Sequence, residues 1–237
     1  MKTVYLSPST QHDNIGVGNY GRECDRMNQT ADIAQEVLER HGVKVYRNKP
    51  EWSLTQVVAD SNLKKPDIHF SIHSNAGNGK ARGCEVYCHR FGGNGEKLAR
   101  DVYEELAPLT PTEDRGVDEG YNFYGQGKHM YELAYTNAPA ALVETAFHDN
   151  PEDAQWIMSH IDLIGTALAK GILKYFRIPF QEESPDLDTE LNVLQEFGII
   201  QSPGYWRKNA VKGKTIAGEY AAILIKRVAA LLMKGGI

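Results

Sequence analysis

Residues 66–76, PDIHFSIHSNA, predict a short buried strand that ends in polar residues. Ile68, Phe70 and Ile72 would alternate onto one face of this strand, and the polar residues between them onto the other. A loop rich in glycine and asparagine follows at once, so the imidazole of His73 is expected at the carboxyl edge of a sheet. In open α/β folds, binding sites form at that edge. His73 is therefore a candidate metal ligand, with a hydrogen-bonded structural histidine as the alternative.

Segments with a strand pattern alternate with segments of helical pattern through the first 178 residues. The expected strands cover residues 2–7, 43–47, 66–76, 83–88 and 140–145; the expected helices cover residues 23–41, 54–64, 96–106 and 161–176, with another beginning after Asn150. Strands that alternate with helices predict an α/β fold: an open, twisted, mostly parallel sheet with helices on both faces.

A second, smaller region follows this alternating part. Residues 179–186, PFQEESPD, are acidic, contain two prolines and lack an apolar period, which predicts a linker. Residues 187–237 then predict a small all-α module, with helices over residues 187–197 and 215–233. The module has a formal charge of +3, whereas the rest of the chain has −8. We expect it to act in targeting or in self-association through its helices, with a helical cap on the first domain as the alternative.

The overall charge and hydropathy exclude two classes of partner. The formal net charge is −5, which does not favour nucleic acid. No apolar run approaches the ~20 residues that a membrane-spanning helix needs, so we expect no membrane insertion.

The first residues become polar too soon for a signal peptide, which predicts synthesis in the cytoplasm.

Four residues near predicted strand ends could together form a hydrolytic metal site. His12 follows the first strand, Glu23 begins the first helix, His73 ends the third strand and Glu144 ends a late buried strand. A hydrolytic zinc site takes three protein ligands and a water, and a carboxylate outside the ligand set can move the proton. His12, Glu23 and His73 would be the ligands and Glu144 the base. Asp25 is a rival ligand, and each residue could instead be structural.

The sequence resembles the zinc-dependent N-acetylmuramoyl-L-alanine amidases of the amidase_3 type, which include phage endolysins and bacterial autolysins. The resemblance covers roughly residues 1–178 and rests on DIHFSIHSNA at 67–76, NAPAALVETAFHDN at 137–150, and Glu23 with Asn28 after it. It implies a catalytic domain that binds one Zn²⁺ through His12, Glu23 and His73, with Glu144 as the catalytic acid and base. One segment departs from the family pattern. The first histidine of the family usually lies in a Pro-Gly-His-Gly-Gly loop, whereas residues 8–12 here are PSTQH.

The resemblance also implies the substrate, which is peptidoglycan, and makes the cell wall the expected target of the module at residues 187–237. The expected reaction is hydrolysis of the amide between N-acetylmuramic acid and L-alanine, after release to the wall through a pore or lysis. Asn75, Arg115 and His148 are candidate substrate-binding residues, and the aromatic loop 115–128 is a candidate groove wall. Two alternatives stay open: a wall-binding protein with a silent metal site, and a zinc peptidase that acts within the stem peptide.

Overall fold

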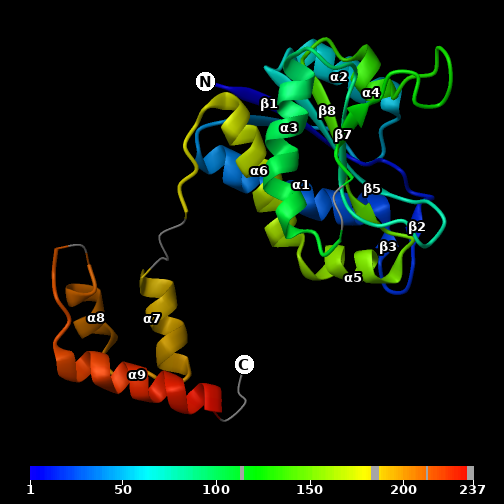
Figure 1. Ribbon diagram of the computed structural model, residues 1–237. Coiled ribbons are helices and arrows are strands. Elements are labelled where there is room, and N and C mark those ends of the chain that lie inside the picture. Colours follow the sequence, from blue (N-terminus) through cyan, green and yellow to red (C-terminus); the bar gives the residue numbers. More distant parts are fainter. Residues whose placement is uncertain (113–114, 183–186, 212, 234–237) are drawn as a thin grey trace. The chain divides into compact units, whose positions relative to one another are not determined.

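The computed structural model describes residues 1–112, 115–182, 187–211 and 213–233 (Figure 1). The chain divides into two compact units, residues 1–180 and 181–237. The first unit extends two residues into the predicted linker, because the ring of Phe180 stacks on that of His41 with a centroid distance of 5.2 Å. Residues 183–186 of that linker lie outside the described residues.

A six-stranded sheet forms the centre of the first unit. Its strands are β1 (Thr3–Pro8), β4 (Lys44–Arg47), β5 (Ile68–Asn75), β6 (Glu85–Cys88), β7 (Val117–Glu119) and β8 (Ala140–Phe147), in the order β4-β1-β5-β8-β6-β7. The first four strands of that order are parallel. Strand β6 is antiparallel to β8 and parallel to β7. The predicted α/β fold with a mostly parallel sheet is confirmed.

The two faces of the sheet are covered by different helices and have different chemistry. Helices α1 (Glu23–Arg40), α3 (Asn94–Leu106) and α6 (Ile161–Phe176) pack together over the main apolar core (Figure 1). Ile68, Phe70 and Ile72 of β5 belong to that core. On the opposite face, helices α2 (Leu54–Lys64) and α4 (Tyr131–Tyr135) make polar contacts with β1 and β5. His69 and Ser71 of β5 are fully buried on that face.

Several connecting elements were not predicted from the sequence. They are the two-residue strands β2 (Ile15–Gly16) and β3 (Gly21–Arg22), strand β7, helix α4 and the 3₁₀ turn η1 (Ala107–Leu109). All are short, so they contain too few residues to show a period. The predicted start of helix α5 (Pro151–Ser159) is observed, since the side-chain oxygen of Asn150 accepts hydrogen bonds from the amides of Glu152 and Asp153.

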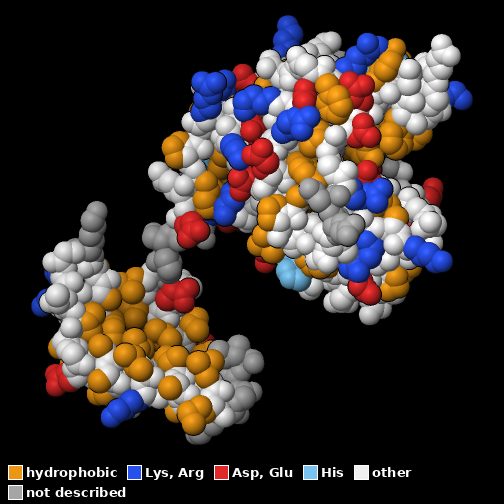
Figure 2. All heavy atoms as spheres, in the orientation of Figure 1, with side chains coloured by type: hydrophobic (Ala, Val, Ile, Leu, Met, Phe, Trp, Pro, Cys, Tyr) orange, Lys and Arg blue, Asp and Glu red, His pale blue; other side chains and the backbone are white. Residues whose placement is uncertain are grey.

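The second unit contains three described helices: α7 (Leu187–Glu196), α8 (Pro203–Asn209) and α9 (Gly218–Met233). They surround a small core of Leu191, Ile199, Ile200 and Trp206. Figure 2 shows that hydrophobic side chains also gather on the visible face of this unit. Among the described helices of the chain, none has the length and hydropathy of a membrane span.

The contact between α3 and α6 depends on Gly171, and this predicts a large effect of a small substitution. A Cβ atom at residue 171 would lie 2.4 Å from Cα of Val102 and 2.9 Å from the carbonyl oxygen of Asp101. The two backbones must separate to admit it, so Gly171→Ala should lower the free energy of unfolding by about 1–3 kcal/mol in a denaturant titration. Gly93→Ala is the control, since a Cβ there meets nothing within 4 Å. Equal stabilities of the two variants would contradict this explanation.

Candidate active site

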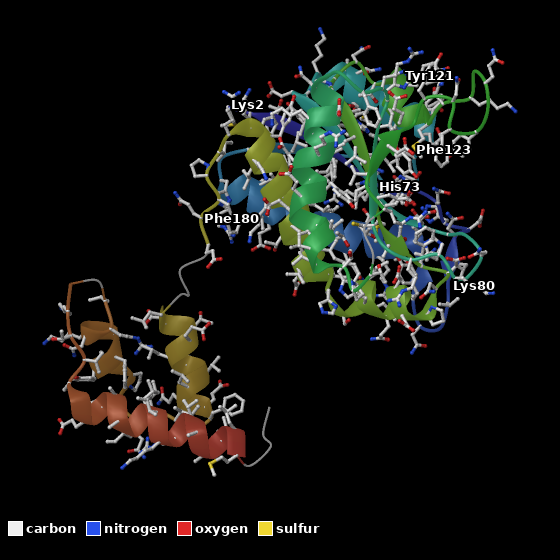
Figure 3. All side chains as sticks on the ribbon, in the orientation of Figure 1. Lys2, His73, Lys80, Tyr121, Phe123 and Phe180 are labelled. Carbon is white, nitrogen blue, oxygen red and sulfur yellow. The ribbon has the colours of Figure 1, made fainter. Side chains whose placement is uncertain are left out.

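His73 and Glu23 meet at the carboxyl edge of the sheet. The Nδ1 atom of His73, at the end of β5, lies 2.9 Å from Oε1 of Glu23, the first residue of α1. Both side chains are buried, and Figure 3 shows His73 in the interior of the first unit. Burial alone would raise the pKa of Glu23, but the hydrogen bonds from His73 and Asn14 lower it overall. Burial alone would lower the pKa of His73, but Glu132 and Glu23 raise it well above its ordinary value.

Glu144 lies next to this pair in the sheet. It is the register partner of His73 across β5 and β8, and of Glu85 across β8 and β6. Its Oε2 atom is buried and has no hydrogen-bond partner within the described structure. Burial is the main cause that raises the pKa of this carboxyl to about 8; the charges of Glu23 and Glu85 add to the increase and that of His73 opposes it. A cation brought close to Glu144 would lower that pKa.

The ring of His12 contacts other residues than His73 and Glu23. Its side chain is exposed, its Nε2 atom donates to the carbonyl oxygen of Pro50 at 3.0 Å, and its Nδ1 atom lies 3.3 Å from Sγ of Cys24. The neighbouring residue Gln11 approaches the pair instead, with Nε2 3.4 Å from Nδ1 of His73. The metal-ligand role of His12 stays a prediction, and Gln11 is the residue of this loop that faces His73.

Glu132 and Glu85 are two site residues that sequence reasoning missed. Glu132 is buried on α4, with Oε2 3.8 Å from Nε2 of His73. Glu85, on β6, accepts from Asn75 at 2.9 Å and from Arg115 at 3.0 Å. The signal in the sequence was an acidic residue between apolar neighbours, as in MYEL for Glu132 and CEVY for Glu85. A carboxylate in such a position is costly to bury unless it has partners.

The three predicted substrate-binding residues have different surroundings. Asn75 and Arg115 converge on Glu85, which is opposite Glu144 in the sheet. His148 is 2% exposed, and its Nδ1 atom lies 2.9 Å from Oγ of Ser74. A role of each in substrate binding stays a prediction.

The aromatic loop lies near Glu85. Phe123 packs edge-on against Tyr87 at a centroid distance of 5.2 Å, and the hydroxyl of Tyr87 donates to Glu85 at 2.7 Å. Phe123 and Tyr124 are 46% and 64% exposed. Tyr121 is held by the stacked ring of His129, 4.5 Å away between centroids. Tyr121 and Phe123 are both labelled in Figure 3. These contacts would suit a groove wall with aromatic faces available to a ligand.

Two donor atoms at His73 and Glu23 have a spacing that fits a divalent cation. No cluster of three or more His, Cys, Asp or Glu side chains arranged for a metal occurs in the described part of the chain. Two ligands of a tetrahedral zinc, each bonded at about 2.1 Å, lie roughly 3.4 Å apart, close to the 2.9 Å between Nδ1 of His73 and Oε1 of Glu23. The unpartnered oxygen of Glu144 is a further donor atom, and the neighbouring acids Glu85 and Glu132 add negative charge, which favours a cation.

A family model matches the part of the chain that contains the candidate site. The model described as Amidase_3, N-acetylmuramoyl-L-alanine amidase, matches residues 6–174, which is more than half of the chain. That range includes every residue of the candidate site.

Two curated relatives are similar to the chain over the same region. The chain is 28% identical over 187 residues to N-acetylmuramoyl-L-alanine amidase LytC of Bacillus subtilis, covering 74% of this chain and 36% of that protein. It is 33% identical over 187 residues to N-acetylmuramoyl-L-alanine amidase CwlM of Bacillus licheniformis, covering 75% of this chain and 70% of that protein. The chain thus spans only about a third of LytC.

The fold is also that of a solved catalytic domain. The catalytic domain of CwlV, an N-acetylmuramoyl-L-alanine amidase from Bacillus (Paenibacillus) polymyxa var. colistinus, superposes with a TM-score of 0.66 and 21% identity. The match covers 76% of this chain and 100% of that domain. At this identity, the similarity shows the fold alone.

The raised pKa of Glu144 predicts how the metal-free protein responds to pH. Between the ordinary pKa of 4.5 and the folded-state pKa of about 8, the folded protein keeps a proton that the unfolded chain has lost. Stability should therefore fall as pH rises from about 5 to about 8, by at most about 1.4 kcal/mol per pH unit from this group. Glu144→Gln should flatten that slope in denaturant titrations with a chelator present.

Glu51→Gln is the matched control for this measurement, because Glu51 is exposed in a loop of the same unit. It should keep the pH dependence of the original protein. An identical slope in the Glu144→Gln protein would mean that Glu144 is ionised without metal.

Proposed function

Because the chain belongs to the Amidase_3 family of N-acetylmuramoyl-L-alanine amidases, we propose that it hydrolyses the amide between N-acetylmuramic acid and L-alanine in peptidoglycan. The observation that supports this most is the position of Glu144. Its unpartnered, buried carboxyl oxygen lies on the strand next to the His73–Glu23 pair. The cell wall would then be the place of action.

The mechanism assigns separate tasks to the ligands and to the base. Glu23 and His73 would hold a zinc ion, which, when bound, polarises the scissile carbonyl and makes a water acidic. Glu144 takes the proton from the attacking water and returns it to the nitrogen of L-alanine as the amide bond breaks. A carboxyl whose pKa lies near the working pH can perform both transfers. Burial raises the pKa of Glu144 to about 8 without metal, and a bound cation would lower it from that value.

The substrate side of the proposal rests on charge and aromatic surface. Arg115 would pair with a stem-peptide carboxylate, since its side chain is 39% exposed while its Nε atom is held by Glu85. The exposed rings of Phe123 and Tyr124 would pack on the sugar or peptide of the strand. Asn75 would bind the substrate beside Glu144, and His148 would orient the strand end through Ser74.

One observation supports a second candidate, a wall-binding protein with a silent metal site. His12, the expected third ligand, directs both ring nitrogens to Pro50 and Cys24. The peptidase alternative has no comparable support. The amino termini produced from peptidoglycan distinguish all three: L-alanine termini from an amidase, other termini from a peptidase, and none from a binding protein.

Substitution of the base should separate turnover from metal binding. Glu144→Gln keeps the side-chain size but removes the proton carrier, so release of L-alanine amino termini should fall by about 10²–10⁴-fold. Zinc content, measured on protein purified without added metal, should stay unchanged. Chelation should abolish activity in the original protein, and Zn²⁺ should restore it. Full activity of Glu144→Gln would exclude this residue as the base.

For the second unit, we propose wall targeting or self-association through the helices. A cavity of about 370 Å³ on this unit has Trp206, Tyr220 and Ile223 among its lining residues, and the end of α9 exposes Leu232 and Met233. The basic charge of the unit suits an anionic wall.

Deletion of residues 181–237 should lower the fraction of protein that sediments with purified walls, and should leave cleavage of soluble muropeptides unchanged. Light scattering of the full chain and the deletion variant reports self-association. If neither sedimentation nor molar mass changes, the second unit has neither role.

A further inference from the structure

The imidazole of His73 is contacted by carboxylates on both of its ring nitrogens. On one side, Nδ1 lies 2.9 Å from Oε1 of Glu23, with Gln11 also within 3.4 Å. On the other side, Nε2 lies 3.8 Å from Oε2 of Glu132. An imidazole that binds a metal with one nitrogen usually donates the hydrogen of the other to a carboxylate, carbonyl or water. The two sides of His73 therefore suit two different tasks.

Glu132 is itself held in one position by partners from two strands. Its Oε1 atom accepts from the hydroxyl of Ser7 on β1 at 2.5 Å and from Nε2 of His69 on β5 at 3.0 Å. The Nδ1 atom of His69 lies 2.9 Å from the hydroxyl of Ser61 on α2. Ser61 and His69 are fully buried, Ser7 is 2% exposed and Glu132 is 4% exposed. One oxygen of Glu132 thus anchors the carboxylate, and the second oxygen faces His73.

We propose that Glu132 is a positioning residue for the metal centre: its Oε2, at an ion-pair distance of 3.8 Å from Nε2 of His73, draws closer when the ion binds, accepts the Nε2–H and so presents Nδ1, beside Glu23, to the ion. This rests on the proposed function only in so far as His73 and Glu23 bind the metal. The carboxylate selects one tautomer of the imidazole, limits its rotation and increases its basicity. Loss of such a partner lowers metal affinity by about 10- to 100-fold.

A purely structural role for Glu132 makes a different prediction. If Glu132 only satisfied Ser7 and His69, its loss would change stability, and the ring of His73 would keep its tautomer. Ser61→Ala is the matched control, because Ser61 contacts the far nitrogen of His69 and belongs to the same buried network. It should lower stability without changing zinc affinity.

The test measures zinc binding and the protonation of the ring in the full chain. Long-range ¹H–¹⁵N spectra of ¹⁵N-histidine-labelled protein, assigned with His73→Gln, should show Nε2 protonated and Nδ1 bound to zinc. Glu132→Gln should weaken zinc binding in competition titrations by about 10- to 100-fold and mix the tautomers of His73. Circular dichroism shows whether each variant is folded.

Three results would overturn the inference. In the first, zinc binds Nε2 of His73. In the second, the unsubstituted protein does not bind zinc through His73. In the third, the Glu132→Gln protein keeps its zinc affinity. The first needs only the original protein, so it stands even if Glu132→Gln does not fold. Failure of the proposed function has a distinct result: a protein that binds zinc through Nδ1 of His73 but releases no L-alanine termini from peptidoglycan.

Discussion

The buried contact between His73 and Glu23 is the interaction on which the geometry of the site depends. It joins the end of β5 to the first turn of α1, two segments fifty residues apart in the sequence. A buried carboxylate and imidazole stabilise one another only when their geometry is good, because each has lost its hydration. The parallel β1–β5 pairing and the apolar packing of α1 therefore have to place both groups together, and the fold as a whole determines the site.

Sequence patterns predicted most of the fold because its longer elements have clear periods. Residues 54–64 and 161–176 form helices with the expected bounds, and Ile68, Phe70 and Ile72 enter the core as their alternation indicated. The same reasoning failed for α4 and β7, which have five and three residues. Their conformation depends on tertiary contacts, such as the bond between the amide of Gly120 and the carbonyl of Cys88.

The site was predicted less completely than the fold, for a physical reason. A strand-end position identifies candidates such as His73 and Glu144, but side-chain direction inside a loop depends on neighbours that a pattern does not contain. His12 and Gln11 are adjacent, and the structure directs Gln11 toward His73 and His12 toward Pro50. Glu132 and Glu85 acquire their roles only through partners far away in the sequence, so neither stood out as a site residue before the sheet was formed.

The pairing of Glu85 with Glu144 across β6 and β8 has one more consequence. Two acidic groups directly opposite on antiparallel strands destabilise the sheet where they meet. The charge of Glu85 is one cause that keeps Glu144 protonated in the metal-free protein, and a bound cation would allow Glu144 to ionise beside it, so ligand binding, proton release and folding become linked equilibria. In cells, the chain would then be most resistant to unfolding and proteolysis in the form that is ready for catalysis, and molecules that failed to acquire their ion would be removed first.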